Sequence, residues 1–254
     1  MGQRKAKLVT NEPKKTLILG VLAGAYISVG ALLALTIGAN CPGLVGSNQG
    51  LQRLIYGAIG LPFGLFFTLV CGGELFTGNT AAMMAAVLEK RATVKQLAKN
   101  WVVSFSANLV ASLAMAWLVF HSGVVFNPAA AVGMAVYKTK LSFGAAFIRG
   151  MLCNWLVCMA VWMASGCTSA TDKFVSIWLP ITAFTAIGFE HSVANMFLIP
   201  LGIMHGAPVS MATFFIKNLL PVTLGNILGG ALGISGAYSM VYGDLDKEAE
   251  SRYI

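Results

Sequence analysis

Two short motifs place acidic and amide side chains, and one histidine, inside long apolar runs of the sequence. They are GELFTGN at 73–79 and GFEHSVAN at 188–195, and in each a glutamate precedes an asparagine by five positions. A carboxylate at the centre of a bilayer costs at least about 2.5–3.5 kcal/mol, so such groups mark functional or structural sites. The two pairs are Glu74 with Asn79 and Glu190 with Asn195.

One histidine could bind an anion or transfer a proton at such a position. His191 is the only histidine inside an apolar run, because His121 and His205 fall at the ends of runs. A neutral imidazole donates one hydrogen bond to an anion, whereas an imidazolium donates two and adds charge. We therefore expect His191 to hold an anion or to give it a proton. Because like charges repel, Glu74 and Glu190 are expected to be structural and to accept N–H groups freed by a helix break.

The elements that carry these motifs are membrane-spanning helices. The 254 residues are 57% hydrophobic and 10% charged, which excludes a soluble enzyme, a disordered tail and a coiled coil. The net charge of +8 does not indicate nucleic-acid binding, because the positive residues lie between apolar runs. A span needs about 20 apolar residues, and six are predicted. They are 17–39, 54–88 with a break, 101–120, 143–167, 174–204 with a break, and 214–241.

The positive residues predict the orientation. With the N-terminus inside, the inner segments carry twelve Lys and Arg residues and the outer segments four. Positive residues favour the cytoplasmic side. Residues 1–16 are thus predicted to be a basic cytoplasmic N-terminus, and residues 243–254 a cytoplasmic tail. The channel domain between them, at 17–242, is predicted to lie in the plasma or inner membrane. Residues 123–137 are expected to form an interfacial loop or helix.

The sequence also repeats itself. Lys99-Asn100 is followed by Asn108, and Lys217-Asn218 by Asn226, at equal spacing. The two repeats, about 17–122 and 143–242, have three spans each, and an odd number of spans inverts the second repeat. Broken helices at matched positions of inverted repeats form permeation sites near the bilayer midplane. Irregular backbone there must be satisfied by protein or by a water-filled path.

The strings GGELFTGNT, CNWLVCMAVWMA, GFEHSVANMFLIPLGI and KNLLPVTLGNILGG resemble the formate/nitrite transporter family over about residues 17–242. The resemblance implies an all-α, aquaporin-like homopentamer with one pore per subunit. It also implies passage of small monovalent anions of weak acids, such as formate, nitrite or hydrosulfide. Transport would be passive or coupled to protons, with no cofactor and no enzymatic activity.

The resemblance also implies roles for individual residues. Lys138 matches the basic residue placed near the pore in many members, where it would raise the local concentration of anions at an outer vestibule. Lys140 is a rival for this role. Leu61 stands where formate channels carry phenylalanine, which leaves the preferred anion open. The pore residues are Thr77, His191, Asn226, Asn154 and Lys138, and the apolar constrictions are Leu65, Leu75, Phe184 and Leu61.

Two other classes of protein are alternatives. A membrane anchor subunit of a redox enzyme would need paired intramembrane histidines as haem ligands, and only one histidine lies within a span. A purely structural role would not explain why two helices break at matched positions. The five cysteines form no CxxC pair, which favours packing over metal binding.

Overall fold

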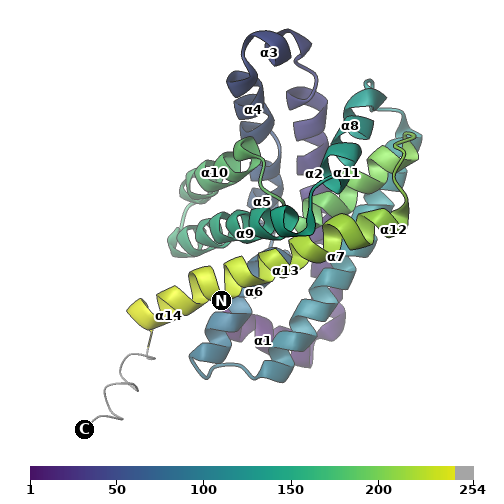
Figure 1. Cartoon of the computed structure of the whole chain (residues 1–254). Helices are drawn as coiled ribbons and strands as arrows, with labels where there is room; N and C mark the ends of the chain where they lie inside the picture. Colours follow the sequence, from purple (N-terminus) through teal and green to yellow (C-terminus); the bar gives the residue numbers. More distant parts are fainter. Residues whose placement is uncertain (244–254) are drawn as a thin grey trace.

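The structure is a computed structural model that describes residues 1–243, and Figure 1 shows this part to be helical throughout, with no strand. The first seven helices are α1(Gly2–Asn11), α2(Pro13–Gly38), α3(Pro42–Ser47), α4(Gln49–Ala58), α5(Leu61–Val70), α6(Phe76–Leu88) and α7(Val94–Ser122). The others are α8(Pro128–Thr139), α9(Phe143–Gly166), α10(Ala170–Ile187), α11(Ser192–Met204), α12(Met211–Thr213), η1(Phe214–Leu219), α13(Leu220–Leu228), η2(Gly229–Gly236) and α14(Ala237–Tyr242). Most of the predicted tail at 243–254 lies outside the described residues.

The predicted spans are present. Five stretches are long and apolar enough to cross a membrane, and α10 with α11, bent by 49°, makes a sixth. The shorter α6 continues the second span beyond its break. Large apolar side chains face outward on these helices, for example Leu179, which is 61% exposed, and Leu232, which is 62% exposed. Such a surface is expected of a protein surrounded by lipid.

Both motifs break their helices at glycines. The chain leaves α5 at Val70 and re-enters a helix at Phe76, and it leaves α10 at Ile187 and re-enters at Ser192. Gly72 has φ of 85° in the first break, and Gly188 has φ of 92° in the second. Glycine adopts this left-handed conformation without steric penalty, which ends the helix.

The last span packs closely on α9 through small residues. A Cβ atom at Gly225 would collide with the carbonyl of Phe147, and one at Gly229 with that of Met151. This contact is the close backbone approach that GxxxG spacing allows between membrane helices. The same span contains two π-helical segments, η1 and η2, on either side of α13.

The two repeats enter the bundle from opposite ends, as an inverted repeat requires. Figure 1 shows α1 at one end, here named the α1 side, and α3, α4 and α8 at the other, named the α8 side. The structure adds a short helix to the front of each predicted repeat. Repeat one begins with α1, which packs on α6, and repeat two begins with α8, which packs on α11. The expected interfacial element at 123–137 is thus the packed helix α8.

Candidate functional site

A cluster of side chains surrounds the first buried carboxylate. Lys5 of α1 donates to Glu74 Oε1 at 2.7 Å. The side-chain amides of Asn79 and Asn100 donate to Glu74 Oε2 at 2.8 and 3.1 Å. Asn79 also donates to Asn100 Oδ1 at 2.9 Å, so the two amides hold each other in place. The Glu74 carboxylate is therefore paired with an ammonium and two amides, as a buried charge requires.

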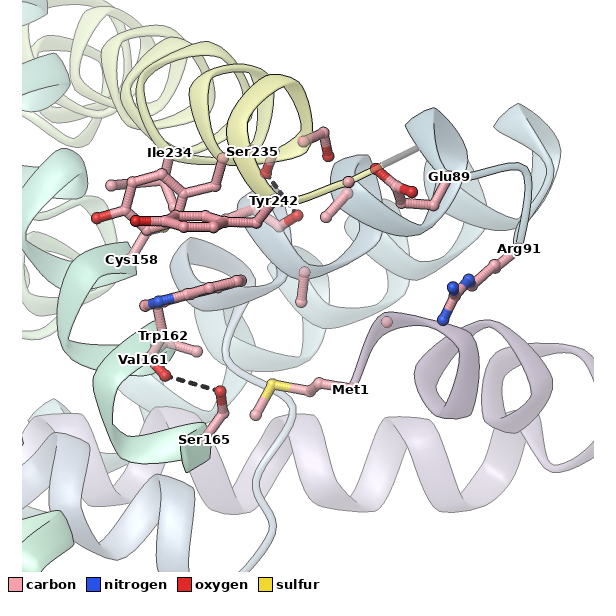
Figure 2. Close-up of a pocket in the computed structure, with 17 residues that line it drawn as sticks. Met1, Glu89, Arg91, Cys158, Val161, Trp162, Ser165, Ile234, Ser235 and Tyr242 are labelled. Carbon is pink, nitrogen blue, oxygen red and sulfur yellow. Dashed lines mark hydrogen bonds between the residues drawn. The ribbon is translucent and has the colours of Figure 1, made fainter. Parts of the chain in front are cut away.

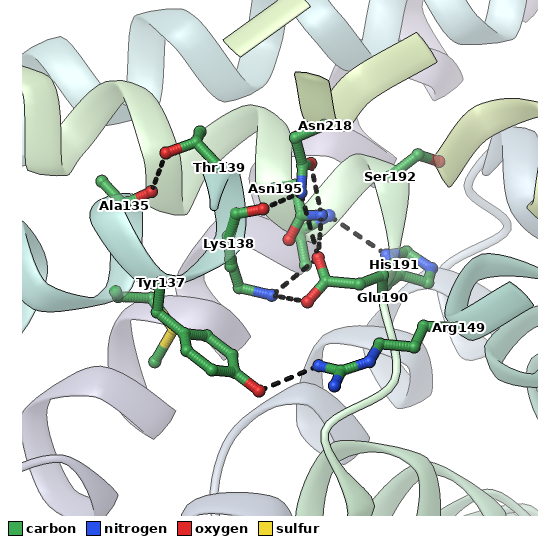
Figure 3. Close-up of polar contacts among 12 residues, drawn as sticks. Ala135, Tyr137, Lys138, Thr139, Arg149, Glu190, His191, Ser192, Asn195 and Asn218 are labelled. Carbon is green, nitrogen blue, oxygen red and sulfur yellow. Dashed lines mark hydrogen bonds and ion pairs between the residues drawn. The ribbon is translucent and has the colours of Figure 1, made fainter. Parts of the chain in front are cut away.

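The second carboxylate has the same surroundings, drawn in Figure 3. Lys138 of α8 donates to both oxygens of Glu190 at 3.1 Å. Asn195 and Asn218 donate to Glu190 Oε2 at 2.7 and 3.3 Å, and Asn195 also donates to Asn218 Oδ1 at 2.8 Å. The expectation that the two glutamates accept backbone N–H groups is wrong in this respect, because their donors are side chains. Lys138 points at Glu190, and the rival Lys140 is exposed at the end of α8.

Two asparagines satisfy the backbone of the breaks. Asn108 accepts from Phe76 N–H and donates to the carbonyls of Gly20 and Glu74. Asn226 accepts from Ser192 N–H and donates to the carbonyls of Gly150 and Glu190. These bonds match pair for pair across the repeats. They replace the helical bonds that the breaks remove, which is the condition for irregular backbone at membrane depth.

His191 and Thr77 meet where the two breaks face each other. Thr77 Oγ1 lies 3.0 Å from His191 Nε2, and both side chains are buried. His191 Nδ1 accepts from Ala194 N–H at 3.1 Å and so caps α11. A backbone N–H is always a donor, so Nδ1 is the acceptor, and a neutral imidazole carries its proton on Nε2. His191 therefore presents an N–H donor, with Thr77 as its partner in this structure.

Asn154 of α9 donates hydrogen bonds to residues of both repeats. Its amide donates to the Thr77 carbonyl at 3.1 Å, to Thr80 Oγ1 at 2.8 Å and to the Asn226 carbonyl at 2.6 Å. Neither Asn154 nor Asn226 lines the cavities described below. Both hold the breaks in position, and direct contact of either with an anion stays a prediction.

Three cavities follow one another past His191. A cavity of about 180 Å³, here named the outer cavity, opens near α4 and α8 and is lined by Lys138, Glu190 and His191. A space of about 10 Å³ lies between His191 and Leu65. A second space of about 10 Å³, here named the inner cavity, lies between Leu65 and Lys5. About 10–15 Å³ holds one water molecule, so the passage narrows to a single small molecule on both sides of Leu65.

The predicted constriction residues all line this passage. The ring of Phe184 stacks on that of His191, with centroids 6.0 Å apart and planes at 20°. The Phe184 and His191 rings thus form one wall of the narrow part. Leu61 and Phe184 line the outer cavity and the first narrow space, Leu65 lines both narrow spaces, and Leu75 lines the inner cavity.

The inner cavity is the counterpart of the outer cavity under the repeat. Lys5 corresponds to Lys138 there, and Met1 corresponds to Met134. Leu75 takes the place of His191, so an imidazole is present at one of the two breaks and a leucine at the other. Beyond it, on the α1 side, lies a wider cavity of about 310 Å³ that Met1 also lines, together with Trp162 and Tyr242. Figure 2 shows these side chains.

The sequence showed some of these residues without assigning them a role. Asn100, Asn108 and Asn218 stand out in the repeated pattern, and the structure places them on the carboxylates and the breaks. In the sequence, Lys5 is one of several positive residues of the basic N-terminus, which gives it no individual role. Its position before the first repeat, matching Lys138 before the second, is the signal that could have revealed it.

Comparisons with known proteins show which family the chain resembles. A family model described as formate/nitrite transporter matches residues 1–240. A probable formate transporter of Methanothermobacter thermautotrophicus is 43% identical and covers 90% of this chain and 89% of its own length. The formate channel FocA of Escherichia coli K12 is 35% identical, covering 92% and 88% of the two chains.

Solved structures match as well. An ion channel of the FNT family superposes with a TM-score of 0.85 at 33% identity, over 93% of this chain and 94% of the other. A pentameric formate channel with formate bound superposes with a TM-score of 0.79 at 30% identity, over 90% and 97%. These matches confirm the all-α, aquaporin-like fold and give no support to a redox anchor. The chain belongs to the formate/nitrite transporter family.

Proposed function

We propose that this protein is a membrane channel for formate and other small monovalent anions of weak acids, with one path in each subunit of a homopentamer. The observation that carries the proposal is the row of cavities that passes His191 at the meeting point of the two breaks. The resemblance to a pentameric channel with formate bound supports the substrate and the assembly. Nitrite and hydrosulfide are further candidates at the level of the family.

The path combines a polar contact with dry constrictions. Leu65, Leu75 and Phe184 leave room for about one water molecule, so a hydrated cation does not pass. An anion that sheds its water next to His191 gains the Nε2–H donor, whose partner in this structure is Thr77. Thr77 itself lines none of the four cavities, and its contact with an anion stays a prediction. The Glu190 carboxylate does not repel this anion at full strength, because Lys138 neutralises it.

The hydrogen bonds of His191 favour one of its two expected roles. A proton relay requires Nδ1 to gain a proton, and Nδ1 already accepts the cap bond from Ala194 N–H. Protonation would place two N–H groups against each other and leave a buried donor unsatisfied, at about 1–3 kcal/mol. We therefore propose that His191 acts as a neutral hydrogen-bond donor rather than as a proton relay.

Selectivity against divalent anions tests the proposed function. Sulfate is expected not to pass, because its second charge raises the cost of dehydration at the constrictions. The change Leu65→Ala widens the narrowest part and should admit sulfate while formate still passes. Flux of both anions into proteoliposomes measures this, and wild-type sulfate flux equal to formate flux would contradict the dry constriction.

We further propose that the α1 side faces the cytoplasm. The segments that share a side with the N-terminus in the predicted topology carry twelve Lys and Arg residues, and the opposite segments carry four. A cysteine at the exposed Val94 should react with an impermeant thiol reagent only from the cytoplasmic side. One at the exposed Ser47 should react only from outside. Labelling of the unsubstituted protein is the background, and the reverse accessibility would overturn the orientation.

A further inference from the structure

The outer cavity needs a source of positive charge if anions are to gather there. The sequence assigned this role to Lys138, which does line the cavity. However, the Lys138 ammonium contacts both oxygens of Glu190, whose side chain is 1% exposed. The pair carries no net charge, and the same arrangement holds for Lys5 and Glu74 in the other repeat. Both pairs are thus part of the scaffold, and neither leaves a free charge for the anion.

One other cation lines the outer cavity. Arg53 of α4 lines it as well, and this residue is exposed. Within residues 1–243, Arg53 makes no ion pair. Arg149 lies nearby, where it donates to the hydroxyl of Tyr137, another residue of the cavity lining.

The distribution of carboxylates explains why Arg53 stays uncompensated. Among the described residues, Glu190 is the one carboxylate that lines the outer cavity, and Lys138 is already paired with it. None of the others lines this cavity; they lie at the end of α1, in the first break, at the end of α6 and in the first turn of α10. They are Glu12, Glu74, Glu89 and Asp172.

We infer that Arg53 is the residue that draws the permeating anion into the outer cavity, and that Lys138 is a structural partner of Glu190. An uncompensated charge at the mouth of a low-dielectric cleft raises the local concentration of counter-ions and their rate of arrival. Arg53 thereby sets the concentration of anion that the path needs for half its maximal flux. The inference rests on the proposed function, since it assigns a capture residue to the same path.

Formate uptake by proteoliposomes tests it, with Arg53→Gln, Arg53→Lys and Lys140→Gln. At low ionic strength, Arg53→Gln should lower flux about three- to tenfold at formate concentrations far below half-saturation, with the maximal flux unchanged. The defect should fade in salt of about 1 M, where the Debye length falls to about 3 Å. Arg53→Lys keeps the charge and should behave as wild type.

Lys140→Gln is the matched control, because it removes an equal charge from an exposed residue on the same side that does not line the cavity. It should change the flux little. Equal fluxes for Arg53→Gln and wild type at low salt, or equal defects in Arg53→Gln and Lys140→Gln, would overturn the inference. Absence of formate flux in the wild type would instead overturn the proposed function.

Discussion

His191→Phe is expected to lower formate flux by about tenfold or more while the protein still folds. The change removes the Nε2–H donor and leaves the buried Thr77 hydroxyl without its partner, at about 1–3 kcal/mol. It also removes the cap on Ala194 N–H, which costs about 0.5–2 kcal/mol. Flux in proteoliposomes and thermal unfolding in detergent separate the two effects. Flux equal to that of the wild type would show that anions do not pass His191.

His191→Asn separates the donor role from a proton relay. Asparagine is a favourable N-cap residue, so its Oδ1 can accept from Ala194 N–H while its amide still donates. It gains no proton near neutral pH. If His191 acts as a neutral donor, the variant keeps the wild-type shape of flux against pH between about 5 and 8. If the flux of the wild type responds to pH and this response is lost in His191→Asn, the imidazole gains and gives up protons during transport.

Lys138→Met is expected to destabilise the protein by about 3–5 kcal/mol. The change leaves the Glu190 carboxylate buried, with the amides of Asn195 and Asn218 as its remaining donors. Removing one partner of a buried ion pair is costly because the other charge stays uncompensated. The free energy of unfolding, from denaturant titration in detergent, measures the loss.

Two further variants check the cause. Replacing both partners, as Lys138→Met with Glu190→Gln, should recover most of the stability, because no unpaired charge remains. Lys140→Met removes an exposed charge on the same helix and should cost little. A double variant as unstable as Lys138→Met alone would mean that packing of the lysine stem, and not the charge pair, is what α8 contributes.

The sequence predicted the spans and their breaks because both depend on local properties. Apolar runs of sufficient length define the helices, and Gly72 and Gly188, each two residues before a glutamate, end them. The inverted repeat followed from the matched spacing of asparagines. The structure shows what these asparagines do. The side chains of Asn108 and Asn226 form hydrogen bonds that replace those lost in the breaks.

Other features could not be predicted from the sequence, because they depend on contacts between distant segments. Lys138 and Glu190 are 52 residues apart, and Lys5 and Glu74 are 69 apart. A lysine considered alone attracts anions, whereas a lysine bound to a buried carboxylate does not. The packing of α1 was also hidden, because its buried face consists of Gly2, Ala6 and Val9, which carry a weak hydrophobic signal.

Formate flux through the purified wild-type protein in liposomes tests the central claim most directly. The path past His191 predicts flux that rises in proportion to the protein reconstituted, with His191→Phe at or near the rate of protein-free liposomes. Folding of both proteins is checked by size-exclusion chromatography before reconstitution. Wild-type liposomes no more permeable to formate than protein-free ones, with nitrite and hydrosulfide equally excluded, would contradict the account.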